Sequence, residues 1–174
     1  MAVGVAELVG GALGGAIVTS VITPLLAQRI DRRQHRASAL SALGLIEQSR
    51  WGDEDFRAFR EAVRKLRTTA LVAGADRTLV DRYLLYAQVA RQTSDWNVEI
   101  ADGYPEAAGI PTSLANLVRA AAEALVDHLW HPWRTRIFRA HIVRQLDRAV
   151  DRIKRADEER NMAPTIAWEV TPIR

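Results

Sequence analysis

An uncharged apolar stretch near the start of the chain, residues 8–28, constrains the fold more than any other part of the sequence. A transmembrane helix needs about 20 mostly apolar residues, and this stretch reaches that length without a charged side chain. Its leucine, isoleucine and valine residues contribute about −3 to −5 kcal/mol to insertion, which the glycines, the hydroxyl side chains and Pro24 partly offset. The stretch predicts a single transmembrane helix, with residues 1–28 as the anchor. The alternative is a helix buried on all sides within a soluble protein.

A basic cluster follows the apolar stretch directly, while no lysine or arginine precedes it. Cationic side chains beside a membrane span are retained on the cytoplasmic side. We therefore expect a single-pass protein of the cell membrane with most of the chain in the cytoplasm. Residues 29–36 then form a juxtamembrane linker whose arginines bind anionic lipid headgroups, each by about 1 kcal/mol. These arginines are Arg29, Arg32, Arg33 and Arg36.

Two pairs of glycines in the apolar stretch lie four residues apart, Gly10 with Gly14 and Gly11 with Gly15. On a helix this spacing puts small residues on one face, where the backbone of a second helix can approach closely. Glycine also lowers helix propensity by about 1 kcal/mol in water, which favours a packing role for these four. The pattern predicts a homo-oligomer formed through the transmembrane helix. The alternative is a lipid-facing helix that tolerates glycine and has no partner.

The rest of the chain has the size and composition of one domain with a substantial core. The 174 residues include no cysteine, which excludes a disulfide framework and thiolate chemistry. The net charge of +3 arises beside the membrane, in residues 29–36, so the domain itself is nearly balanced. A balanced domain gives no reason to expect binding to nucleic acid.

Apolar residues at helical spacing predict successive helices in this domain. The first covers residues 37–50, with Leu40, Leu43 and either Leu45 or Ile46 on one side. The second begins at Asp53, whose charge suits a helix N-terminus, and ends at Gly74, a natural C-cap. The third is capped by Asp76 and runs to about residue 93, forming a tight antiparallel hairpin with the second.

The second half of the chain starts with an irregular segment, residues 94–111, which contains Trp96 and Tyr104. These aromatic residues either contact a partner or fold back over the core. A fourth helix starts at Thr112 or Ser113, and Pro132 separates it from a fifth. Residues 161–174 form an extended tail in which residues 165–170, including Trp168, have strand character. This tail docks on the bundle or on a partner.

These patterns predict an all-α fold, in which an N-terminal transmembrane helix precedes an antiparallel bundle of four to five helices over residues 37–160. The expected core includes the seam of the second helix and the inward faces of the fourth and fifth helices. The seam begins with Phe56, and the inward face of the fifth helix begins with Phe138 and continues through Ile142, Ala149 and Ile153. The core residues on which we rely most are Phe59, Val63, Leu66, Leu125 and Leu146.

The sequence lacks the common catalytic and nucleotide-binding motifs, including a phosphate loop, GxGxxG, GxSxG and HExxH. Asp127, His128 and His131, with Glu123 one turn earlier, share helical faces and are the strongest candidates for a metal site. The chain has none of the paired Glu-x-x-His motifs of di-iron bundles. The simpler interpretation is that the histidines interact with the end of their helix. We therefore predict no metal and no cofactor.

The sequence favours a membrane-anchored helical bundle that binds other proteins as an adaptor, scaffold or assembly subunit, and that is not an enzyme. Trp96, Tyr104 and Trp168 are the candidate partner contacts. A second hypothesis is a membrane-active, pore-forming effector, based on the same glycine face. A third is a metal-dependent helical enzyme, based on the histidines near Trp130. A soluble helical protein with a buried N-terminal helix is the remaining alternative.

Overall fold

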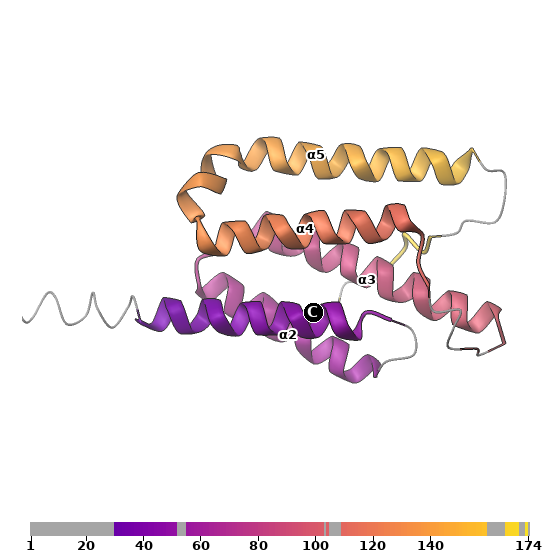
Figure 1. Ribbon diagram of the computed structural model, residues 1–174, viewed down its shortest axis with the longest axis horizontal. Coiled ribbons are helices and arrows are strands. Elements are labelled where there is room, and N and C mark those ends of the chain that lie inside the picture. Colours follow the sequence, from indigo (N-terminus) through magenta and orange to yellow (C-terminus); the bar gives the residue numbers. More distant parts are fainter. Residues whose placement is uncertain are drawn as a thin grey trace, which may run out of the picture. The chain divides into compact units, whose positions relative to one another are not determined.

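Five helices account for most of the residues that the structure describes (Figure 1). The structure is a computed structural model, and the described residues are 30–51, 55–102, 104, 109–159, 166–170 and 173. The N-terminal helix covers residues 30–49 within this range. It is followed by α2 (Phe56–Val72), α3 (Arg77–Ile100), α4 (Thr112–Trp130) and α5 (Pro132–Glu158). The described residues contain no strand, so the predicted all-α bundle is confirmed for this part of the chain.

The predicted transmembrane helix, residues 8–28, lies outside the described residues. Within the described part of the chain, no helix combines the length and the apolar character that a membrane span requires. The anchor therefore stays a prediction from the sequence. Residues 35–174 belong to one unit of the chain, and the packing described below is the packing within that unit.

The α2–α3 hairpin follows the predicted local chemistry closely. Gly74 has φ +86°, a left-handed conformation that glycine adopts without steric cost, and the Ala75 N–H donates to the Ala70 carbonyl at 2.8 Å. The Asp76 carboxylate then accepts hydrogen bonds from the N–H groups of Thr78 and Leu79. At the other end of α2 the cap is Asp55, which accepts from the Arg57 N–H at 2.8 Å. The predicted start at Asp53 lies outside the described residues.

Helix α3 is longer than predicted, because it continues past residue 93 to Ile100 and includes Trp96. The irregular segment was predicted from its polar residues, glycines and prolines, yet polar side chains at its start bond within the helix. The Thr93 hydroxyl donates to the Val89 carbonyl at 2.8 Å, and Arg91 pairs with Asp95 one turn later at 3.0 Å. Burial of this segment against the bundle thus overrides its weak helix propensity.

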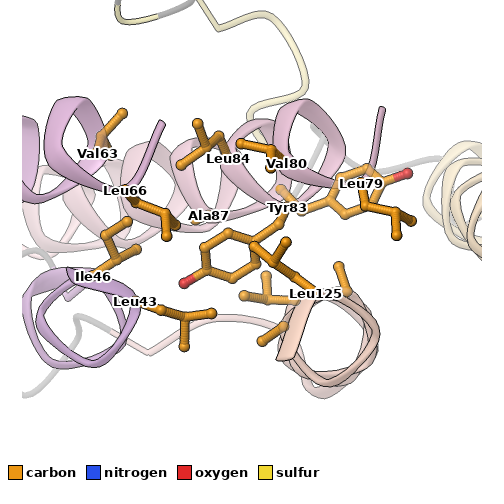
Figure 2. Packing of buried hydrophobic residues seen from close by; sticks show 14 of the residues in the cluster. Leu43, Ile46, Val63, Leu66, Leu79, Val80, Tyr83, Leu84, Ala87 and Leu125 are labelled. Carbon is orange, nitrogen blue, oxygen red and sulfur yellow. The ribbon is translucent and has the colours of Figure 1, made fainter. Parts of the chain in front are cut away.

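The core lies where α3 meets the N-terminal helix, α2 and α4. Figure 2 shows Tyr83 of α3 reaching between the N-terminal helix, which supplies Leu43 and Ile46, and α4, which supplies Leu125. All five of the core residues named from the sequence are buried. On the N-terminal helix the structure selects Ile46 for the core and leaves Leu45 47% exposed.

Two aromatic residues that were predicted to face inward are instead exposed. Phe56 lies in the first turn of α2, where it stacks on Phe59 at 6.3 Å between ring centroids and remains open to solvent. Phe138 lies at the edge of the inward stripe of α5. Thr135 and Leu146 are the buried residues of that helix, and at 100° per residue Phe138 points about 60° away from Thr135. Ile142, Ala149 and Ile153 are half-buried on the same stripe.

The C-terminal tail docks on the bundle, which was one of the two predicted outcomes. Ile166 is buried, the Ala167 N–H donates to the Thr93 hydroxyl at 3.1 Å, and the Ile173 N–H donates to the Gln88 side chain at 3.1 Å. The predicted strand character over residues 165–170 was wrong for residues 166–170, which form no strand. Side-chain acceptors on a helix hold this segment, and no strand among the described residues pairs with it.

We predict that Leu66→Ala lowers the free energy of unfolding by about 2–5 kcal/mol, because Leu66 is fully buried in the core. Denaturant unfolding followed by circular dichroism measures this change. Leu45→Ala is the matched control on an exposed leucine, and its expected effect is about 0.5 kcal/mol or less. Equal effects of the two substitutions would contradict the assignment of the core.

Candidate functional site

An open groove between α4 and α5, with a volume of about 790 Å³, is the best-formed candidate site on the described surface. The two helices run antiparallel, and His131 alone separates them. The floor of the groove is apolar, and Leu117 and Leu146 are buried within it. The groove is also lined by small side chains, which leave space between the two helices. These are Ala120, Ala124 and Ala149.

The rim of the groove is polar and carries both signs of charge. Glu123 and Asp127 lie along α4, and Arg152 lies on α5. From Ser113 to Asp127 the groove follows α4 for about four turns, or roughly 21 Å at 1.5 Å per residue. An apolar floor of this length between polar margins has the form of a surface that receives a helix.

The turn that joins α4 to α5 is held by His128, which is buried at the end of α4. Its Nε2 accepts a hydrogen bond from the Asp76 N–H at 2.9 Å, so the proton of the neutral ring lies on Nδ1, which contacts the Thr135 hydroxyl. Thr135 in turn donates to the His131 carbonyl at 3.3 Å. These bonds connect α4 to the α2–α3 turn and fix the rotation of the first turn of α5.

Burial lowers the pKa of His128, although the charge of Asp76 acts in the opposite direction. The neutral ring is thus the form that the fold requires. A hydrogen bond from Arg139 to the second carboxylate oxygen of Asp76, at 2.9 Å, joins α5 to the same point. His128 and Asp76 together form a polar joint at this end of the bundle.

The candidate metal ligands are not brought together. His131 contacts Asp127 at 3.2 Å on the surface, whereas His128 turns away from them towards Asp76 and Thr135. Glu123 lines the groove. Within the described ranges, no three His, Asp or Glu side chains are grouped as a metal ion would require.

The three predicted partner contacts separate into two groups. Trp96 of α3 and Trp168 of the tail are both half-buried and line a second hollow of about 610 Å³. Lys154 of α5 covers the Trp168 ring, with its ammonium 5.2 Å from the ring centroid. Tyr104 does not line this hollow and is exposed. The tail thus fills part of the surface that Trp96 would otherwise present.

Most of the residues predicted to act at the membrane lie outside the described residues, namely Gly10, Gly11, Gly14, Gly15 and Arg29. Arg32 and Arg33 belong to the N-terminal helix and are exposed, while Arg36 is half-buried.

Two surfaces were missed at the level of sequence. The available signal for the groove was the pair of small residues Ala120 and Ala124, four residues apart on α4. The second surface consists of large apolar residues exposed around the α4–α5 turn, Trp130, Trp133, Ile137 and Phe138. Arginines are interspersed among the apolar residues of this stretch, and that mixture was the available signal.

No protein-family model, curated protein or solved structure gives a significant match to the chain.

We predict that stability falls as the pH drops below about 6.5, because the unfolded chain then takes up a proton that buried His128 resists. His128→Gln keeps a hydrogen-bond acceptor and does not titrate, so this variant should lose part of the pH dependence between pH 7 and 5. Urea unfolding at each pH measures the free energy of unfolding and so its pH dependence. His141→Gln, at an exposed position of α5, should retain the wild-type dependence. An unchanged pH dependence in His128→Gln would contradict the role of the joint.

Proposed function

We propose that this chain is a membrane-anchored adaptor whose α4–α5 groove binds an amphipathic helix of a partner protein. The observation that carries the proposal is the groove itself, which combines an apolar floor about four helical turns long with a polar rim. Helix-in-groove recognition needs these two features and no catalytic group.

The floor and the rim define the chemistry of the partner. Small residues such as Ala120 and Ala124 allow a second helix to approach at the short end of the usual 8–10 Å between helix axes. The partner helix needs apolar residues at positions i, i+3 or i+4, and i+7 to contact the floor. Basic residues on one flank would meet Glu123 and Asp127, and an acidic residue on the other flank would meet Arg152.

The membrane part of the proposal comes from the sequence. Residues 8–28 form the anchor, and the arginines of residues 29–36 keep the bundle in the cytoplasm. Self-association through Gly10, Gly11, Gly14 and Gly15 belongs to the same proposal, since it would place two grooves side by side on one membrane.

We predict that a photo-crosslinking amino acid at Ala120 forms an adduct with a partner protein in the native membrane, because this exposed residue lines the groove. The matched control is Ala58, an exposed alanine of α2 away from the groove, where no adduct is expected. Introducing a charge into the floor with Ala124→Arg should abolish the Ala120 adduct. Adducts of equal yield at Ala58 and Ala120, or an Ala120 adduct that survives Ala124→Arg, would contradict the docking role.

We predict that the full chain stays in membranes during carbonate extraction and that a C-terminal tag is protected from protease added outside intact cells. The reason is the apolar span followed by four arginines, with none before it. An N-terminal tag is the control, and it should be cleaved under the same conditions. Release of the protein by carbonate would contradict the predicted anchor. Cleavage of the C-terminal tag from outside would contradict the predicted orientation.

A further inference from the structure

The α4–α5 turn exposes more large apolar surface than a bundle end needs. Trp133 is 69% exposed and Ile137 is 71% exposed, and Trp130 and Phe138 lie beside them in sequence with more than half of their surface open. We call these four residues the aromatic tip. Exposed apolar residues grouped in this way mark an interaction site, whereas single exposed residues are ordinary.

The aromatic tip lies at the same end of the bundle as residue 35. Tyr83 of α3 bonds to Glu47, and Arg91, farther along α3, bonds to the carbonyl of Ser49, so the N-terminal helix runs parallel to α3. Residue 35 therefore lies towards the start of α3. The bond from Asp76 to His128 places the α4–α5 turn beside the start of α3 as well. Figure 1 shows α3 beginning at the end of the bundle where α4 turns into α5.

The charge around the aromatic tip is basic. Between His128 and Leu146 the sequence contains four arginines and no acidic residue. Cations near the N-terminus of α5 oppose the helix dipole, so stability of the helix does not explain them. The nearby acidic groups already have partners, since Asp76 forms an ion pair with Arg139 and Asp127 contacts the His131 ring at 3.2 Å. Arg134 and Arg136 are exposed and form no ion pair with the described residues.

These observations describe one kind of partner. Tryptophan is enriched at the interface between lipid and water, and interfacial helices combine Trp and Phe with arginine. The chain between the predicted anchor and residue 35 covers at most about 25 Å when extended, so the proposed anchor would limit how far residue 35 can lie from the bilayer. Anionic headgroups complement the unpaired arginines, and the outermost acyl region complements the apolar side chains.

We propose that the aromatic tip inserts into the surface of the anionic membrane leaflet that faces the bundle, so that the bundle is held at the bilayer by its α4–α5 turn as well as by its anchor. The nearness argument rests on the proposed anchor, while the exposure and the charge of the tip do not. Contact at this end leaves the α4–α5 groove, which extends away from the turn towards Ser113, open to a partner.

The test uses the full chain in vesicles of phosphatidylcholine with phosphatidylglycerol. Because the chain has no cysteine, Ile137→Cys gives a single site for a nitroxide label. Ser113→Cys, exposed at the opposite end of α4, is the matched control. We expect the label at residue 137 to be accessible to oxygen and to lose its accessibility to a water-soluble nickel chelate. The label at residue 113 should stay accessible to the chelate. Phosphatidylcholine alone should restore access at residue 137.

Three outcomes would overturn the inference. Equal access of the chelate to both labels in anionic vesicles would show that the tip remains in water. Dipolar broadening between nitroxide labels at residue 137 would show that a second copy covers this residue. Equal protection of residue 137 in neutral and anionic vesicles would show that the arginines play no role. Carbonate extraction of the same vesicles separates this inference from the proposed anchor. If the protein stays in the vesicles during carbonate extraction but its tip is exposed to water, only the inference is contradicted. If carbonate releases the protein although its tip contacts lipid in the vesicles, only the anchor is contradicted.

Discussion

The burial of α3 is the constraint on which the rest of the structure depends. This helix is covered by the N-terminal helix, α2, α4 and the C-terminal tail, and it places polar side chains among apolar ones. A buried polar group is costly unless it is hydrogen-bonded, so each of these side chains requires a partner at a defined position. Tyr83 donates to Glu47 at 2.9 Å, and Arg91 donates to the Ser49 carbonyl at 2.9 Å. Burial and the Glu47 charge raise the pKa of Tyr83, which keeps this donor protonated.

The same constraint explains why α5 differs from the other helices. It contacts α3 through the ion pair between Arg82 and Asp147, and it buries only Thr135 and Leu146. It also packs along α4 through Leu146 and the half-buried Ile142, Ala149 and Ile153, but this packing does not close the apolar stripe completely. The groove beside Leu146 and the exposed Trp133 near the turn both follow from this partial packing. The groove and the aromatic tip, which we propose for function, are thus apolar surfaces that are not buried in the core.

Local patterns in the sequence were sufficient where a feature depends on neighbouring residues. Gly74 and Asp76 form the predicted turn because their roles require only backbone geometry and short-range hydrogen bonds. The buried seam of Phe59, Val63 and Leu66 follows from helical periodicity alone. The end of α3 was misjudged because burial of residues 93 and 94 is a tertiary effect. Phe138 was placed inward because periodicity does not give the exact rotation of a helix.

The sequence by itself determined the all-α class, the hairpin and most of the core, since helical period and capping chemistry are encoded within a few residues. It also carries the prediction of an anchor, which depends on length and hydrophobicity. Only the tertiary structure decided what His128 does, because its partners at residues 76 and 135 are joined by the fold. The groove and the aromatic tip likewise arise from how far α5 packs against α4. That distance is set by contacts between segments remote in sequence, which no local pattern records.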